Sequence, residues 1–140
     1  MMVEYCAFCR LARNEIPAAY VYGDEETLAF LDTRPVSEGH TLVIPRKHYE
    51  NIYDIPDDEV AYLFRIVRKM AFAVKTAVAA DGIRIVQNNG SAAGQAVFHF
   101  HVHIIPAYEG QEMHQHRKVH EAAELDDVAK KIRLSLENRP

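Results

Sequence analysis

Three histidines alternate with apolar residues in the stretch Phe98-His99-Phe100-His101-Val102-His103-Ile104-Ile105-Pro106. Alternation with a period of two predicts a β-strand rather than a helix. Successive side chains of a strand point to opposite faces, so the three imidazoles share one face and the apolar side chains the other. The apolar face would belong to the core, which predicts a strand inside a sheet. The row of imidazoles would form either a metal site or a catalytic site.

The 140 residues suit a single domain, and we expect one domain over residues 1–140 with its own hydrophobic core. The composition is 49% apolar and 26% charged, and the net charge of -4 gives no reason to expect binding to nucleic acid or to an anionic membrane. No apolar run reaches transmembrane length, and residues 1–5 do not resemble a signal peptide. We therefore expect a cytoplasmic protein that binds a small molecule.

The only two cysteines, Cys6 and Cys9, form a Cys-x-x-Cys motif. In a reducing compartment such a pair indicates a metal site or a redox pair rather than a structural disulfide. A thioredoxin-like redox pair would follow a hydrophobic strand, and the sequence before Cys6 does not resemble one. The segment 6–14 is predicted to be a short helix or knuckle, which Pro17 prevents from continuing.

Four further strands are predicted from short β-rich runs between turn residues. The first two would form a hairpin around the turn 23–26, and Pro45 would end the third. The runs are Ala19–Tyr22, Thr27–Leu31, His40–Pro45 and Ile83–Gln87.

Two helices are predicted from apolar residues that recur at three and four positions. The longer would begin at Asp57 and Asp58, which suit capping, and would end at Asp81-Gly82. The other would lie near the C-terminus. The apolar stripes are Val60, Leu63, Phe64, Val67, Met70, Ala71, Val74 and Val78 in the first, and Leu125, Val128, Ala129, Ile132 and Leu136 in the second.

Between the fourth strand and the histidine strand lies a loop of small residues, 88–95. Backbone N–H groups in such a loop can approach phosphate oxygens, although a plain hairpin connection would look similar. Three more histidines, His114, His116 and His120, lie in a polar segment and show no partner in the sequence. They are predicted to be solvated surface residues.

Tetrahedral zinc takes four nitrogen or sulfur ligands, and Cys6 and Cys9 supply two of them from one turn. A site made only of the three strand histidines would leave the cysteines unexplained. Two cysteines with two histidines would instead close a structural site and leave other histidines free. A remaining neutral histidine could attack an activated phosphoryl group.

These motifs resemble the histidine triad (HIT) superfamily of nucleotide hydrolases and transferases. His99 to Ile105 matches its His-apolar-His-apolar-His-apolar-apolar signature, and the segments 29–35, 39–48 and 88–95 match in order and spacing. The chain is most similar to the histidine triad nucleotide-binding branch, including zinc-carrying bacterial members. The resemblance covers residues 6–106 and leaves out a C-terminal extension, 109–140.

The resemblance implies an α+β, HIT-like domain. It implies a meander-like antiparallel sheet of about five strands with one long helix packed on it. The apolar pattern of residues 125–136 adds a C-terminal helix. The resemblance also implies a symmetric homodimer.

By position in the family motif, His101 would be the nucleophile toward the α-phosphorus of a nucleotide. His103 would contact the phosphate and help the leaving group, and His40 would border the same site. A structural zinc ion would be held by Cys6, Cys9, His48 and His99. The remaining nucleotide contacts would be made by Asp32 at the ribose hydroxyls, by Phe8, Leu11, Ile16 and Phe30 at the base, and by Asn88, Gly94 and Gln95 at the phosphate.

One departure concerns the leaving group, since Ala96 stands where many members carry a serine or threonine that touches the phosphate. His103 argues against the hexose-1-phosphate uridylyltransferase branch, which has glutamine there, so hydrolysis is favoured over transfer. The resemblance implies an enzyme that hydrolyses purine nucleotide derivatives, either phosphoramidates or dinucleoside polyphosphates, through a nucleotidyl-His101 intermediate that water converts to nucleoside monophosphate. The alternatives are a non-catalytic nucleotide-binding protein and a zinc-stabilised interaction protein.

Overall fold

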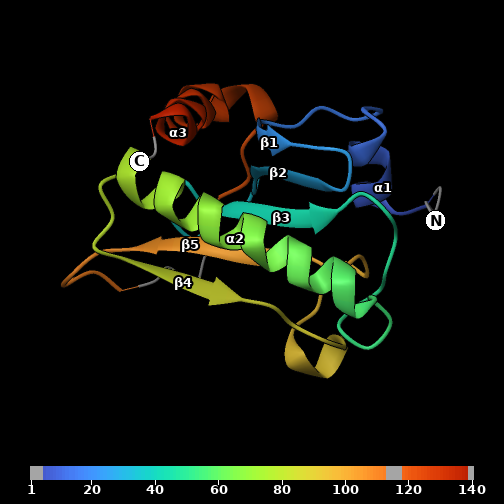
Figure 1. The fold of residues 1–140 in the computed structure, drawn as a ribbon. Coiled ribbons are helices and arrows are strands. Elements are labelled where there is room, and N and C mark those ends of the chain that lie inside the picture. The colour runs from blue at the N-terminus through green and yellow to red at the C-terminus, as the bar shows by residue number, and fades with distance from the viewer. Residues whose placement is uncertain (1–4, 113–117, 139–140) are drawn as a thin grey trace.

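A computed structural model describes residues 5–112 and 118–138, and it confirms the α+β architecture (Figure 1). One five-stranded antiparallel sheet has the order β1-β2-β3-β5-β4. The first three strands follow one another as a meander, whereas β5 lies between β3 and β4. The strands are β1 (Tyr20–Gly23), β2 (Thr27–Leu31), β3 (Thr41–Pro45), β4 (Gly82–Val86) and β5 (Val102–Ala107).

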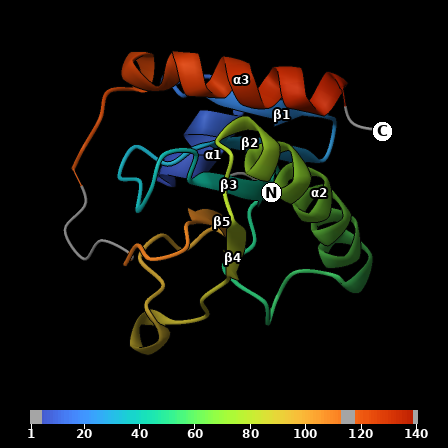
Figure 2. The same ribbon diagram turned by 90° about the vertical axis from the view of Figure 1, so that its left-hand side faces the viewer.

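The two central strands β2 and β3 are buried on both faces, and alternate residues enter two different cores. Leu31 and Val43 join the larger core beneath the long helix α2 (Asp57–Ala77). Phe30 and Leu42 join a smaller core with the short helix α1 (Ala7–Ala12). The two helices therefore cover opposite faces of the sheet (Figure 2).

Helix α2 confirms the predicted longest helix, but three details differ. Pro56 occupies the N-cap position and the two aspartates lie in the first turn, where their charge favours the helix N-terminus. The helix ends at Ala77, four residues earlier than predicted, and the chain turns at Ala79, whose φ is +52°. Phe64 is exposed, while Ile66 and Ala73 are buried instead.

The histidine strand is shorter than predicted, because β5 begins only at Val102. Its partner strand β3 ends at Pro45, which has no N–H to donate, and the N–H of Phe100 instead donates to the carbonyl of Tyr49. The alternation nevertheless persists: Phe100, Val102 and Ile104 are fully buried in the larger core, and only Phe98, 42% exposed, departs from the prediction.

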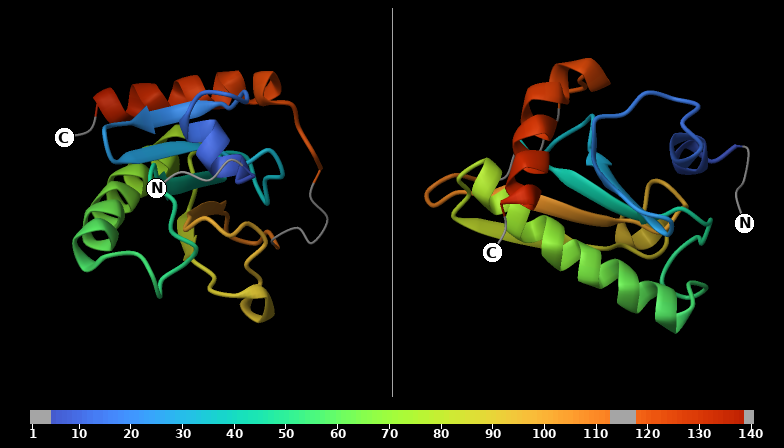
Figure 3. Two further views of the ribbon diagram at one scale, coloured as in Figure 1. Left: turned by 90° about the vertical axis from the view of Figure 1, so that its right-hand side faces the viewer. Right: turned by 45° about the horizontal axis from the view of Figure 1, so that its top comes forward.

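The predicted C-terminal helix is confirmed as α3 (Asp126–Glu137), preceded by a 3₁₀ turn, η2 (Ala122–Leu125). It packs against α2 and along β1, where the Arg133 guanidinium donates to the carbonyl of Tyr20 (Figure 3). A second 3₁₀ turn, η1 (Ser91–Ala93), lies in the predicted small-residue loop. None of the helices in the described ranges is both long and apolar enough to span a membrane.

Candidate functional site

A pocket of about 540 Å³ opens on the α1 side of the sheet, between α1, the segment after β2 and the small-residue loop. Its volume falls in the range of roughly 300–1,000 Å³ typical of small-molecule sites. Most of the predicted nucleotide contacts line it. They are Phe8, Leu11, Ile16, Phe30, Asp32, Asn88, Gly94, His101 and His103.

The imidazoles form a continuous row beside this pocket. Ring centroids of His101 and His103 lie 4.9 Å apart, and those of His103 and His40 lie 5.2 Å apart. His99 lies on the other side of His101 and its ring contacts His48 at 5.1 Å. The predicted catalytic histidines and the predicted zinc histidines are thus neighbours in one row.

His101 is held by the backbone. Its Nδ1–H donates to the carbonyl oxygen of His99 at 2.7 Å, which leaves Nε2 as the unprotonated nitrogen of the neutral ring. The side chain is 8% exposed, and this burial lowers the pKa of His101 below its usual value of 6.5. The bond to the His99 carbonyl and the charge of Asp32 oppose that shift. A neutral, oriented imidazole is the form that a nucleophile requires.

Asp32, His40 and His103 form a second polar group next to His101. Nε2 of His40 lies 3.0 Å from Nδ1 of His103 and 3.5 Å from Oδ2 of Asp32. The other carboxylate oxygen of Asp32 accepts the N–H of Arg34 at 2.8 Å. The Asp32 side chain is 14% exposed and lines the pocket, so a ligand hydroxyl can reach it.

The apolar side chains at one end of the pocket both line the pocket and belong to the hydrophobic core. Phe8, Leu11 and Phe30 belong to the smaller core, and Ile16 packs against it. The Phe8 ring meets Phe30 edge to face at 5.4 Å and His101 at 5.3 Å. An apolar slot that ends at the candidate nucleophile fits a planar base joined through a ribose to a phosphate.

The small-residue loop forms one side of the pocket. Asn88, Gly94 and Ala96 line the pocket, but among the described lining residues Gln95 is missing. Its amide is used inside the loop, since Nε2 donates to the Glu50 carbonyl at 2.6 Å and Oε1 accepts the Gly90 N–H at 2.8 Å. Gln95 therefore shapes the loop in the described structure, and its contact with a phosphate stays a prediction.

The predicted zinc ligands converge on one point. Sulfur of Cys6 lies 3.4 Å from Nδ1 of His99, and sulfur of Cys9 lies 3.4 Å from Nδ1 of His48 and 3.6 Å from Nδ1 of His99. Tetrahedral zinc, with bonds of about 2.3 Å to sulfur and 2.0–2.1 Å to nitrogen, separates neighbouring ligand atoms by roughly 3.6 Å. All four ligand atoms lie within 4.8 Å of one another. The residues therefore fit a closed zinc site.

The surroundings of His99 also suit a metal ligand. Its Nε2–H donates to the carbonyl of Pro45 at 2.8 Å, so the lone pair of Nδ1 faces the cysteines. Burial lowers the pKa of His99 to about 4, which keeps the ring neutral. The backbone N–H of Cys9 donates to the Cys6 sulfur at 3.4 Å and orients it.

Sequence reasoning missed two kinds of group. Arg34 is the only lysine or arginine among the described residues that line the pocket. Its place two residues after Asp32 in a loop was the available signal. The other groups are backbone carbonyls and amides of His99, Pro45 and Val36 that bind imidazole nitrogens. Residue types do not encode these contacts.

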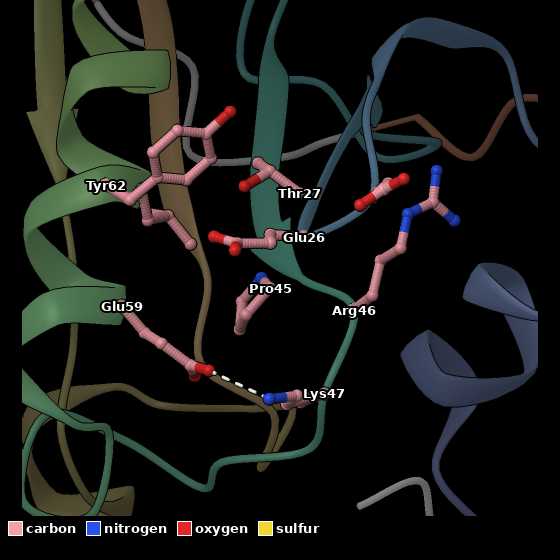
Figure 4. Close-up of a pocket in the computed structure, with 9 residues that line it drawn as sticks. Glu26, Thr27, Pro45, Arg46, Lys47, Glu59 and Tyr62 are labelled. Atoms are coloured by element: carbon pink, nitrogen blue, oxygen red, sulfur yellow. Dashed lines mark hydrogen bonds and ion pairs between the residues drawn. The ribbon is translucent and has the colours of Figure 1, made fainter.

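A smaller hollow lies beneath β3, on the side of Glu59 and Tyr62 (Figure 4). Lys47 donates to Glu59 there at 3.2 Å, and the second carboxylate oxygen of Glu59 is buried with no hydrogen-bond partner in the described structure. The hollow measures about 30 Å³, which is room for a water molecule. It is too small for a nucleotide.

Of the three C-terminal histidines, His114 and His116 lie outside the described residues. His120 is not a free surface residue as predicted. Its ring nitrogen lies 3.4 Å from a Glu124 carboxylate oxygen, and its backbone N–H donates to the carbonyl of Thr33 at 2.8 Å. His120 thus ties the C-terminal extension to the segment that follows Asp32.

Comparison with known proteins agrees with the fold and the motifs. An uncharacterized HIT-like protein of Methanocaldococcus jannaschii is 47% identical over 129 residues, which are 91% of this chain and 98% of that protein. An adenylylsulfatase of Arabidopsis thaliana is 41% identical over 104 residues, 74% of this chain and 53% of that protein.

The structure is also similar to a crystal structure of a Zn-bound histidine triad family protein from Mycobacterium smegmatis. The TM-score is 0.87 at 34% identity, with 96% of this chain and 94% of that chain covered. The model of the HIT domain matches residues 13–110, and the chain belongs to the HIT domain family.

Proposed function

We propose that this protein is a HIT-type nucleotide hydrolase that acts on purine nucleotide derivatives through a nucleotidyl-His101 intermediate. The observation that carries the proposal is the His101 ring, which donates its Nδ1 proton to a backbone carbonyl and lines a pocket of nucleotide size. The unprotonated Nε2 is thereby available to attack phosphorus.

In the first step, Nε2 of His101 attacks the α-phosphorus of the bound nucleotide. The N–P bond forms as the bond to the leaving group breaks, and the leaving group departs with that electron pair. In the second step, water attacks the same phosphorus, the N–P bond breaks, and nucleoside monophosphate and the free imidazole are released. One hard displacement is divided into two easier ones.

The other pocket residues would orient the substrate. Phe8 and Phe30 would enclose the base, and the carboxylate of Asp32 would accept hydrogen bonds from the ribose hydroxyls. Asn88, the N–H groups near Gly94 and the Arg34 guanidinium would face the phosphates and stabilise their charge during transfer. Ala96 leaves room beside them, because a serine hydroxyl is missing there.

Zinc would be held by Cys6, Cys9, His48 and His99, and four protein ligands would leave no position for substrate or water. Its contribution would be to stability. The Zn-bound relative from Mycobacterium smegmatis supports this assignment. A cytoplasmic, reducing location would keep both cysteines available as ligands.

A second copy of the chain would be the protein partner. Within the described residues, no strand pairs with the outer side of β4, and Ile85 of this strand is 43% exposed. Phe64 and Phe72 on α2 are exposed as well, with the Arg68 guanidinium 5.3 Å from the Phe72 ring centroid. An open sheet edge and exposed aromatic side chains on α2 are thus both available to a partner. We propose a symmetric homodimer through β4 and α2.

The substrate class is tested with a panel that comprises an adenosine phosphoramidate, a diadenosine polyphosphate and adenylyl sulfate, each assayed for release of AMP. The adenylylsulfatase relative supports including the third compound. Hydrolysis of at least one by the wild type and of none by His101→Asn supports the proposal. Tight binding of AMP without turnover of any compound would indicate a non-catalytic nucleotide-binding protein, and failure to bind AMP a zinc-stabilised interaction protein.

A further inference from the structure

Two clusters of metal-ligand residues lie close together in the described structure. One is the group Cys6, Cys9, His48 and His99, and the other is the group Asp32, His40 and His103. In each cluster the potential ligand atoms lie within 4.8 Å of one another. Two histidines with one carboxylate is also a common ligand set for divalent metals. Spacing alone does not tell which cluster takes a cation.

Which cluster can bind a cation depends on the hydrogen bond made by the second nitrogen of each imidazole, the one that does not face the other potential ligands. A neutral histidine carries one proton, and a metal binds the nitrogen without it. The usual partner of a metal-bound histidine is therefore an acceptor that takes the N–H on the far side of the ring. His99 has such an acceptor in the carbonyl of Pro45, 2.8 Å from Nε2.

His40 has the opposite arrangement. The backbone N–H of Val36 donates to Nδ1 of His40 at 3.0 Å, so this nitrogen has no proton. The single proton of the neutral ring must then lie on Nε2, which faces Nδ1 of His103 at 3.0 Å and Oδ2 of Asp32 at 3.5 Å. A metal on Nε2 would force the proton onto Nδ1, against the Val36 N–H. The His40 side chain is completely buried, so the ring has no solvent to relieve that conflict.

We infer that the Val36 amide fixes His40 as a hydrogen-bond donor, so that the Asp32–His40–His103 cluster rejects zinc despite its spacing and His40 stays hydrogen-bonded to His103. His40 is accordingly a positioning residue. By donating to Nδ1 of His103 it holds the proton of that ring on Nε2, and His103 lines the pocket. In the function proposed above, His103 then acts as a neutral donor to a phosphate oxygen.

The tautomer can be measured without substrate, so its outcome is independent of hydrolysis. Long-range ¹H–¹⁵N correlation spectra of the zinc-loaded protein separate protonated from unprotonated ring nitrogens. We expect the proton on Nε2 in both His40 and His103, and on Nδ1 in His101. A proton on Nδ1 of His40 would overturn the inference, whatever the enzyme hydrolyses.

Rejection of zinc is tested by calorimetric titration of zinc-loaded protein with further Zn²⁺. Val36→Pro removes the N–H donor, and the matched Val36→Ala retains it. We expect the wild type and Val36→Ala to bind no second ion at micromolar concentration, and Val36→Pro to gain one that Val36→Pro/His103→Asn loses. The inference fails if the wild type binds a second ion that His40→Asn abolishes. It also fails if folded Val36→Pro still rejects zinc.

Discussion

His99 and His101 stand two residues apart in one segment and present opposite nitrogens. Nε2–H of His99 donates to the Pro45 carbonyl and frees Nδ1 toward the cysteines. Nδ1–H of His101 donates to the His99 carbonyl and frees Nε2. Backbone acceptors thus divide one row of identical side chains into a candidate metal ligand and a candidate nucleophile.

The acidic limb of the pH–rate profile should report the pKa of His101. Burial lowers this pKa below 6.5, so the nucleophile stays unprotonated at a pH where a solvated histidine is largely charged. We expect the acidic limb of kcat/KM to have its midpoint below pH 6.5.

The charge of Asp32 opposes the effect of burial, so Asp32→Asn should move that limb to still lower pH. An acidic limb with its midpoint above pH 6.5 in the wild type would contradict the assignment of His101 as a buried nucleophile. An unchanged limb in Asp32→Asn would show that the carboxylate does not act on this ring.

Asp32→Asn should also weaken the preference for ribonucleotides. The carboxylate can accept hydrogen bonds from ribose hydroxyls, and a bond to a charged group contributes about 1.5–3 kcal/mol. We expect kcat/KM to fall ~10- to 150-fold for a ribonucleotide substrate and little for its 2′,3′-dideoxy analogue, compared above pH 7.5, where protonation of His101 does not intervene. Asparagine keeps an oxygen for the Arg34 N–H. An equal fall in kcat/KM for both substrates would show that Asp32 stabilises the structure and does not bind the ribose.

The residue types of the site could be predicted from the sequence, but their individual hydrogen bonds could not. Alternation placed His99, His101 and His103 together, and spacing added the Cys-x-x-Cys pair. The amide of Gln95 donates to the carbonyl of Glu50, a contact across 45 positions that no local pattern contains.

At the level of elements, α1 depends on its surroundings. A six-residue helix is marginal alone, since isolated helices shorter than ~12–15 residues are unstable in water. Cys6 is its N-cap residue and Cys9 lies in its first turn. Zinc bound to both cysteines, His48 and His99 would tie α1 to the segments after β3 and before β5. The helix carries Phe8 and Leu11 into the pocket wall.

Cys9→Ser should therefore weaken zinc binding and nucleotide binding together. Zinc affinity should fall by more than ~100-fold, since losing even an outer-shell partner costs ~10- to 100-fold. We expect a lower melting temperature, and a rise in KM larger than the fall in kcat, because α1 holds the base. Metal analysis by mass spectrometry, thermal unfolding and steady-state kinetics measure these effects.

Ala7→Ser is the matched control, because it changes an exposed position of the same helix and should keep full zinc content. If Cys9→Ser retains one zinc per chain, the ligand set is wrong.

Element types were more predictable than element ends. Periodicity located the histidine strand and both long helices because it reflects burial, and β-rich runs between turn residues located the other four strands of the described sheet. The end of α2 depends on Ala79 adopting a positive φ, and the start of β5 depends on Pro45 in another strand. Neither cause lies in the periodic pattern of the element itself.

For the whole molecule, the proposed dimer makes a specific prediction. Ile85→Glu and Phe72→Glu should each place a charge in the interface and yield monomers in sedimentation velocity, where the wild type is a dimer. Leu134→Glu is the matched control: Leu134 on α3 is 47% exposed, similar to 49% for Phe72, but lies away from β4. If all three variants sediment as the wild type does, the interface is elsewhere.

The strand order could not be predicted from local patterns. Nothing local shows that β5 enters between β3 and β4, or that His120 binds the carbonyl of Thr33. Both depend on long-range pairing. The resemblance to the family predicted the sheet as a whole, and the apolar pattern predicted the C-terminal helix. The packing of this helix against α2 and β1 could be seen only in the structure.

Rapid quench into alkaline denaturant, which preserves an acid-labile N–P bond, tests the central claim most directly, namely that His101 becomes nucleotidylated. Wild-type protein is mixed with a labelled nucleotide substrate, quenched within one turnover, digested, and analysed by peptide mass spectrometry. The account predicts one acid-labile nucleotidyl group on His101, and none in His101→Asn, whose turnover should fall at least ~10³-fold while zinc content and melting temperature are kept. His103→Asn should still form the adduct, ~10²-fold more slowly. Near wild-type turnover by His101→Asn would contradict the covalent mechanism and require direct attack by water.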